Sequence, residues 1–182
     1  ARGVKVRIML SAPMLDQDQP SVARLRAIPG AELRVFDFGE GKRGILHTKY
    51  FIVDSEDAFV GSQNLDWRSL QHIHETGLRF MTSSLVVPLR EIFEIDWEFC
   101  KTHKMPTLPK SAAPSPPTAL ELVASPPGFT PPSIRAALPS LQEILGQAKS
   151  RIRIQLLTYS PVSGKKRFWP DLDYALRAAA VR

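Results

Sequence analysis

The sequence predicts an α/β fold in which a mixed sheet is flanked by helices, seen as parts of two similar halves. Two observations support this prediction. Short apolar runs rich in β-branched and aromatic residues alternate with segments of helical spacing. Nine of the sixteen prolines fall within residues 105–132, as is typical of a linker or of an extended segment on a surface. We therefore expect the C-terminal part of one half at residues 1–104, a linker at 105–117 and the N-terminal part of a second half at 118–182.

The first region alternates between strand and helix patterns. Its expected strands lie at 4–10, 31–38, 47–54, 57–62 and 75–81. Its expected helices lie at 19–28 and 84–100. The third and fourth strands are close enough in sequence to form a hairpin. Pro88 fits best near the first turn of the second helix, where its missing N–H costs least.

The second region shows the same kinds of pattern. We expect an edge strand at 118–124, followed by a helix at 133–150 with a kink or break at Pro139. A strand at 151–159 comes next. A basic loop then leads into a helix within 164–182, with Pro170 in its first turn. The chain ends on a helix pattern and begins with the strand pattern that would follow such a helix. We therefore expect a piece of a longer, internally repeated protein.

The composition narrows the class of partner. A net charge of +6 and a pI near 9.7 favour anionic partners such as nucleic acid, lipid headgroups or phosphate esters. The single cysteine, Cys100, excludes an internal disulfide. No stretch approaches the roughly 20 apolar residues of a membrane span. The apolar run in residues 1–10 is too short, and too interrupted by charge, for a signal peptide.

The stretch ILHTKYFIVD, residues 45–54, contains the first candidate site residues. Side chains alternate between the two faces of a strand, so His47 and Lys49 are expected to point the same way and Asp54 the opposite way. A lysine on a buried strand face is costly unless something compensates its charge. The strand face that carries His47 and Lys49 is therefore either exposed to water or part of a site that needs a base beside a cation.

A longer pattern favours the second interpretation. It reads H-x-K-x4-D-x6-G-S-x-N and consists of His47, Lys49, Asp54, Gly61, Ser62 and Asn64, the last being the only asparagine of the chain. This pattern resembles the H-K-D signature of the phospholipase D superfamily. Six fixed positions over 18 residues make a far more specific match than a lone glycine motif.

The residue types suit attack on a phosphodiester, whose negative charge repels nucleophiles. Lys49 can neutralise that charge, and Ser62 and Asn64 can donate hydrogen bonds to the phosphoryl oxygens. Gly61 lets the backbone approach a ligand closely. An ordinary imidazole is largely unprotonated near neutral pH, so His47 can attack phosphorus. A second group has to protonate the leaving oxygen.

The resemblance implies that this second group is the histidine of another H-K-D motif and that the intermediate is a phosphohistidine. It implies that no metal or other cofactor takes part, and that Asp54 braces the fold rather than touching substrate. The 182 residues contain one such motif, which is half of an active site. Residues 167–182 resemble the opening of a second repeat, so we expect the second motif in the same chain. A homodimer partner is the alternative source.

Three further segments, GSQNLDWRSL, ETGL and KRFWPDLDYAL, resemble the branch that contains lysosomal single-strand 5′-exonucleases and poxvirus-type nicking enzymes. This resemblance implies single-stranded DNA or RNA as the substrate. It assigns Glu75 to an acidic position thought to orient a catalytic histidine. Trp67 and Arg68 match branch positions that carry no assigned role. Members of the superfamily include membrane-anchored lumenal enzymes, and the sequence assigns no compartment to this chain.

Three functional hypotheses stay open at this point. The first is a phosphodiesterase acting on single-stranded nucleic acid, the second a phospholipase D or phosphatidyl transferase, and the third a non-catalytic member that binds phosphate groups or a partner protein. The isolated chain is expected to be inactive unless it pairs with another copy. Trp67, Trp97 and Trp169 are expected to pack against apolar neighbours rather than to stack on bases.

Overall fold

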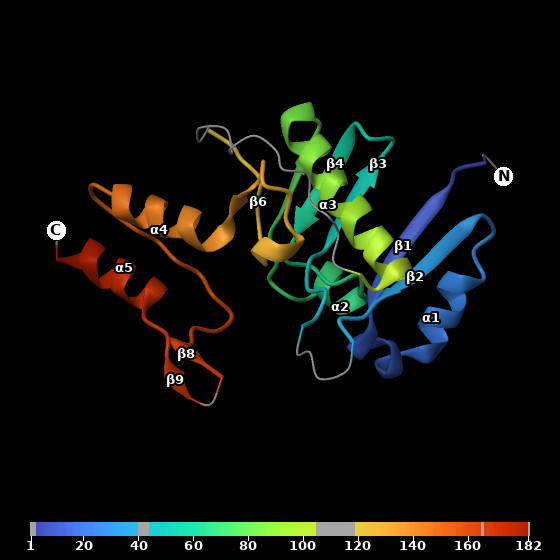
Figure 1. Ribbon diagram of the computed structural model, residues 1–182, viewed down its shortest axis with the longest axis horizontal. Coiled ribbons are helices and arrows are strands. Elements are labelled where there is room, and N and C mark those ends of the chain that lie inside the picture. Colours follow the sequence, from blue (N-terminus) through green and yellow to red (C-terminus); the bar gives the residue numbers. More distant parts are fainter. Residues whose placement is uncertain (1–2, 40–43, 105–118, 165, 182) are drawn as a thin grey trace. The chain divides into compact units, whose positions relative to one another are not determined.

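The computed structural model describes residues 3–39, 44–104, 119–164 and 166–181 (Figure 1). The chain separates into two compact units, residues 1–109 and 110–182, each with its own helices and small sheets. The predicted α/β class is therefore confirmed. The predicted linker at 105–117 lies outside the described residues.

A parallel pair of strands opens the first unit. β1 (Val6–Ser11) and β2 (Ala31–Phe36) pair in register from their first to their last residues. The connection between them contains a 3-10 helix, η1 (Ala12–Gln17), and α1 (Gln19–Arg26). Parallel neighbours need such a crossover, because a tight turn would reverse the direction of the chain.

The local sequence sets the bounds of α1. The Asp18 carboxylate accepts hydrogen bonds from the backbone N–H of Ser21 at 3.1 Å and from its hydroxyl at 2.5 Å, which caps the first turn. The helix ends shortly before Pro29 and Gly30, and Gly30 adopts a positive φ of 79°, which glycine tolerates best. This helix was predicted two residues longer at its end.

The long helix α3 (Ser83–Thr102) covers one face of the β1–β2 pair, and α1 lies on the other side (Figure 1). Its core-facing residues recur at helical spacing: Leu85, Val86, Leu89, Trp97 and Phe99. The ring of the buried Phe36 in β2 lies 5.0 Å from that of Phe99, between ring centres. Pro88 falls in the second turn rather than the first, because the helix begins at Ser83.

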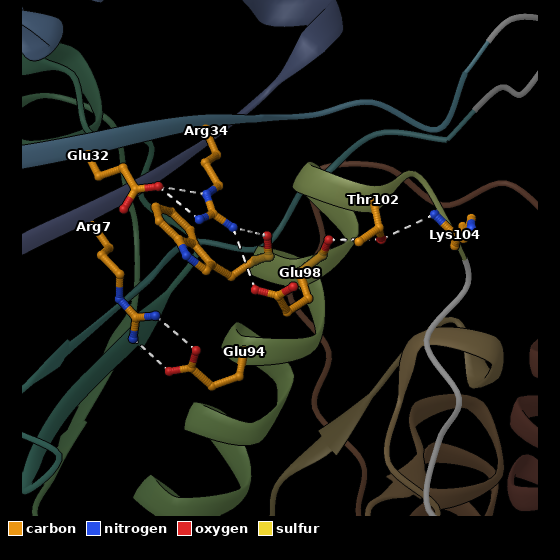
Figure 2. A network of polar contacts seen from close by, with 8 residues as sticks. Arg7, Glu32, Arg34, Glu94, Glu98, Thr102 and Lys104 are labelled. Atoms are coloured by element: carbon orange, nitrogen blue, oxygen red, sulfur yellow. Dashed lines mark hydrogen bonds and ion pairs between the residues drawn. The ribbon is translucent and has the colours of Figure 1, made fainter.

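Charged side chains also tie α3 to the parallel strands (Figure 2). Arg7 of β1 donates two hydrogen bonds to the Glu94 carboxylate, at 2.6 and 2.8 Å. Arg34 of β2 donates to the backbone carbonyl of Trp97 at 2.7 Å, and its guanidinium carbon lies 4.1 Å from the centre of that indole. A planar guanidinium suits both a carboxylate and an aromatic face, so these contacts favour one register of α3 on the strands.

Three antiparallel strands form the second sheet of this unit: β3 (Tyr50–Val53), β4 (Asp57–Gly61) and β5 (Gly77–Phe80), in that order. The predicted hairpin between the first two is confirmed. Asp54 and Ser55 in its turn have positive φ values of 52° and 59°, the sign that tight hairpin turns require at both central residues.

The parallel and antiparallel pairings predicted for one mixed sheet lie in separate sheets within the described part of the chain. A short helix, α2 (Trp67–Gln71), lies between β4 and β5 in sequence and was not predicted. Five residues are too few to display a helical period. The Asp66 side chain caps its first turn by accepting the backbone N–H of Ser69 at 2.8 Å.

The second unit contains shorter strands and two packed helices. Its elements are β6 (Val123–Ala124), η2 (Pro127–Phe129), β7 (Arg135–Ala136), α4 (Ala137–Gln147), β8 (Val162–Ser163), β9 (Arg167–Phe168) and α5 (Asp171–Ala180). Arg135 pairs with Glu121 at 3.2 Å and also with Glu143 of α4. Gln142 of α4 donates to the backbone carbonyl of Asp171 at 3.3 Å, which joins α4 to α5.

Several predictions for the second unit need correction. Residues 151–159 form no strand, and their side chains are exposed. A strand requires a neighbour for its backbone groups, and no described segment pairs with this one. The helix predicted from residue 133 begins at Ala137, so Pro139 lies in its first turn and breaks nothing. The predicted edge strand is reduced to β6, and Pro170 caps α5.

Candidate active site

His47 and Lys49 approach each other in an extended segment that precedes β3. The strand was predicted to begin at His47, but its ladder begins at Tyr50. Alternation along the extended backbone still sends both side chains the same way. The Lys49 ammonium nitrogen lies 3.3 Å from both ring nitrogens of His47. An atom in line with one nitrogen lone pair cannot be equally close to the other nitrogen, so the ammonium is in line with neither.

Backbone hydrogen bonds bring the other motif positions to the same end of the antiparallel sheet. The N–H of Gly61 donates to the carbonyl of Lys49, and the N–H of Ser62 donates to that of Thr76, both at 3.1 Å. Gly61 at the end of β4 also pairs with Gly77 at the start of β5. His47, Lys49, Ser62, Asn64 and Glu75 therefore lie on segments that leave the sheet at one end.

A short hydrogen bond joins Ser62 to Glu75, with the serine hydroxyl donating to the carboxylate. The Ser62 oxygen also accepts the backbone N–H of Thr76 at 3.2 Å. The hydroxyl is thus oriented on its donor side and on its acceptor side. Orientation of a catalytic histidine by Glu75 stays a prediction, since here its carboxylate holds Ser62.

Asn64 is exposed and makes no hydrogen bond to another described residue, so its amide is available to a ligand. The preceding Gln63 has a buried side-chain oxygen that lacks a partner among the residues described. A Cβ on Gly61 would overlap this Gln63 side chain. That amide is the far end of a flexible side chain that can move aside, so the overlap does not by itself require glycine, and the close approach of a ligand at position 61 stays a prediction.

Asp54 lies away from the other motif residues. It occupies the turn at the far end of the β3–β4 hairpin, separated from Lys49 by the whole of β3. The sequence placed it on the opposite strand face, whereas the structure places it at the opposite end of the strand. This position agrees with a role in the turn and keeps its carboxylate distant from the site.

Buried ionisable groups lie behind the His47–Lys49 segment. The Tyr50 hydroxyl is buried without a hydrogen-bond partner among the described residues, and its ring lies 6.4 Å from that of Phe93 on α3. Burial raises the pKa of Tyr50, and the nearby Asp96 carboxylate adds to the rise. Burial also raises the pKa of Asp96, which is 5% exposed, to about 7. The pKa of Cys100 rises to about 11 through burial, with a further contribution from Asp96.

The tryptophans differ in exposure. Trp97 is 4% exposed in the core, as predicted, and Trp169 is half-buried. Trp67 at the start of α2 is 65% exposed, which contradicts the prediction that it packs against apolar neighbours. Its main ring neighbour is His72, in an edge-to-face arrangement with ring centres 5.0 Å apart. The helix leaves this indole on the surface because Ser69, not Trp67, is the buried residue of α2.

Metal-ligand clusters and membrane-spanning helices are both absent from the part of the chain that the structure describes. Within residues 3–39, 44–104, 119–164 and 166–181, no three His, Cys, Asp or Glu side chains cluster as a metal site would require. Over the same residues, no helix combines the length and apolarity needed to cross a bilayer.

Comparison with known proteins gives consistent similarities. Residues 1–97 match a family model described as cardiolipin synthase, PLD-like domain. The chain is 32% identical over 198 residues to the 5′-3′ exonuclease PLD3 of Bos taurus, which covers 98% of this chain and 40% of that protein. It is 30% identical over 205 residues to the human 5′-3′ exonuclease PLD4, covering 98% and 39%. The chain thus spans about two-fifths of the length of these relatives.

Among solved structures, NucT from Helicobacter pylori resembles the chain with a TM-score of 0.48 and 20% sequence identity. The match covers 53% of this chain and 64% of NucT.

Proposed function

The chain belongs to the phospholipase D-like family, and from this premise we propose that it supplies one half of a phosphodiesterase active site that cleaves single-stranded nucleic acid. The matched region, residues 1–97, contains the whole H-x-K-x4-D-x6-G-S-x-N pattern, so the resemblance predicted from that pattern is confirmed. The observation that carries the proposal is the approach of Lys49 to His47 at the sheet end that also presents Ser62 and Asn64.

In the proposed reaction His47 is the nucleophile. In a neutral imidazole one ring nitrogen carries the in-plane lone pair that can attack, and the Lys49 ammonium is not in line with either ring nitrogen. One nitrogen forms a bond to phosphorus while the bond from phosphorus to the leaving oxygen breaks. The leaving oxygen takes a proton from an acid outside this motif. The phosphohistidine keeps the other ester bond and so still carries one nucleoside. Water then attacks its phosphorus and gives a proton to the group that protonated the leaving oxygen, which releases the phosphomonoester and the free imidazole.

Three side chains are proposed to bind the phosphoryl oxygens. Lys49 supplies a fixed positive charge and the exposed Asn64 amide supplies donors. The Ser62 hydroxyl has one proton, which it donates to Glu75 here, so it binds a phosphoryl oxygen by turning that proton from the carboxylate to the ligand. We assign Glu75 the role of positioning Ser62. Asp54 and Gly61 are proposed to serve the fold of the motif.

The leaving-group acid is proposed to be the histidine of a second H-K-D motif. A second half within a longer protein, or a second copy of this chain in a homodimer, could provide it. A monomer of the 182-residue chain is then inactive. Gel filtration combined with a diesterase assay tests this, and an active monomer would contradict the two-motif mechanism.

Two observations support nucleic acid as the substrate. The relatives from Bos taurus and human are named 5′-3′ exonucleases, and a net charge of +6 suits a polyanion. The description of the matching family model as cardiolipin synthase supports a second candidate, phospholipid hydrolysis or headgroup transfer. A member that binds phosphate without turnover is the remaining hypothesis.

The deciding experiment uses the protein with both motifs present. Turnover of a short single-stranded oligonucleotide with a 5′-hydroxyl is compared with turnover of phosphatidylcholine vesicles. We expect the oligonucleotide to be cleaved and a phosphorylated histidine at position 47 to be trapped by acid-free quenching and mass spectrometry. His47→Asn should abolish both signals. Preference for the lipid would overturn the nuclease assignment. Failure to turn over both the oligonucleotide and the lipid would favour binding alone.

A further inference from the structure

A small apolar and aromatic surface follows directly after the candidate phosphate-binding residues. It is formed by Leu65, Trp67 and Leu70, which are 63%, 65% and 60% exposed. A tryptophan side chain offers roughly 150–250 Å² of contact area, so an indole that stays in water loses much of the hydrophobic stabilisation that burial would give. The same chain buries Trp97 almost completely, which shows that a core position for tryptophan exists in this fold.

The α2 helix fixes the position of this indole. Asp66 caps the first turn, and Ser69 on the inner side is 4% exposed. The N–H groups of His72 and Ile73 both donate to the carbonyl of Arg68 at 2.8 Å, which closes the end of the helix. Trp67 therefore projects from an anchored turn, and the His72 ring beside it restricts its rotation.

Trp67 is also near the proposed reaction site. It lies five positions after Ser62, and a chain of five residues spans at most about 18 Å. Arg68, the next residue of the same helix, is exposed and adds a positive charge to this part of the surface. An aromatic platform next to positive charge is the combination that binds single-stranded nucleic acid, because bases stack on the ring while the phosphates meet the cations.

We propose that Trp67 is a stacking platform for a nucleobase of the strand whose phosphate enters the His47 site. The proposal rests on the function proposed above and adds the group that recognises the base. A single indole suffices for one base. An apolar protein partner would need roughly 800 Å² on this side, which the five residues of α2 cannot supply.

The test measures binding of the 182-residue chain to two labelled oligomers by fluorescence anisotropy. One is an oligothymidylate and the other an abasic oligomer of the same length and charge. The parent chain should prefer the oligothymidylate roughly 5- to 150-fold, the range that stacking of one base can provide. Trp67→Ala should remove this preference, whereas Trp67→Phe should retain most of it.

Leu70→Ala is the matched control, because it removes an equally exposed apolar side chain of α2 that has no π face. It should keep the preference. Equal losses in Trp67→Ala and Leu70→Ala would show that apolar contact, rather than stacking on the indole, provides the base preference, and would overturn the proposal. A preference that survives Trp67→Ala, or failure of the chain to bind either oligomer, would also overturn the proposal. Because base preference is read without cleavage, failure of the platform and failure of His47 chemistry give different results.

Discussion

The hydroxyl of Ser62 donates a hydrogen bond to the carboxylate of Glu75, which lies thirteen positions later in the sequence, just before β5. This bond connects two positions to which the sequence analysis gave separate roles, one as a phosphate ligand and the other as an acidic partner of a histidine. We propose that Glu75 acts through Ser62. The two side chains should therefore behave as one unit when either is changed.

The first prediction concerns this unit. With both motifs present, Ser62→Ala and Glu75→Gln should each lower diesterase turnover by about tenfold, the equivalent of about 1.4 kcal/mol. The double variant should lose little more turnover than either single variant. Ser62→Ala removes the hydroxyl and Glu75→Gln removes the carboxylate that orients it, so both changes disable the same group. Steady-state kinetics of the four proteins checks this. If the fold-loss of turnover in the double variant equals the product of the two single losses, Glu75 acts on another group, for example a histidine.

The second prediction concerns the cation. Lys49→Met should lower turnover roughly 100- to 1000-fold, since it removes the fixed charge aimed at the transferring phosphoryl group. Lys101→Met, at an exposed lysine in the last turn of α3, is the matched control and should leave turnover unchanged. Similar losses in both variants would indicate that long-range attraction, not local charge stabilisation, explains the effect.

The third prediction concerns the buried Asp96. Its pKa of about 7 in the folded protein lies above its ordinary value of 3.8, so the folded state keeps a proton that the unfolded chain has released. Stability due to this group is complete below about pH 4 and is lost as the pH rises to about 7. The loss is on the order of 4 kcal/mol, because each tenfold change in proton affinity between the two states is equivalent to about 1.4 kcal/mol.

Asp96→Asn should abolish this decline and stabilise the first unit at pH 8, as measured by urea unfolding at several pH values. Asp57→Asn is the control of opposite sign. A hydrogen bond from Arg79 lowers the pKa of Asp57, so its stabilisation is lost as the pH falls. An unchanged slope in Asp96→Asn between pH 4 and 7 would show that the carboxyl ionises freely in the folded state.

The fourth prediction concerns the glycines at the site end of the sheet. A Cβ on Gly77 would overlap the ring of Phe59, so Gly77→Ala should destabilise the first unit by about 1–3 kcal/mol. Thermal unfolding measures this. In a Phe59→Ala background the same substitution should cost little, because the overlapping ring is gone. If Gly77→Ala destabilises the Phe59→Ala variant as much as the parent, the cause is the backbone conformation at position 77 and not overlap with the ring.

The sequence was sufficient to predict elements whose signals are local. The strands β1 to β5 and the helices α1, α3 and α5 follow from apolar periodicity and from residues such as Asp18 and Pro170, which act within one turn of the chain. The shared direction of His47 and Lys49 follows in the same way, since alternation along an extended backbone needs no distant partner. The motif itself was visible as a fixed spacing of residue types.

Tertiary structure decided whatever depends on a partner distant in sequence. Residues 151–159 have a strand pattern but lack a neighbouring strand in the described chain, so their backbone forms no ladder. Asp54 lies far from Lys49 because it occupies the hairpin turn at the other end of β3. Glu75 faces Ser62 because β5 returns beside β4, and Trp67 is exposed because α2 turns Ser69 inward. Spacing along a chain specifies direction and period, whereas burial and pairing depend on which segments meet in space.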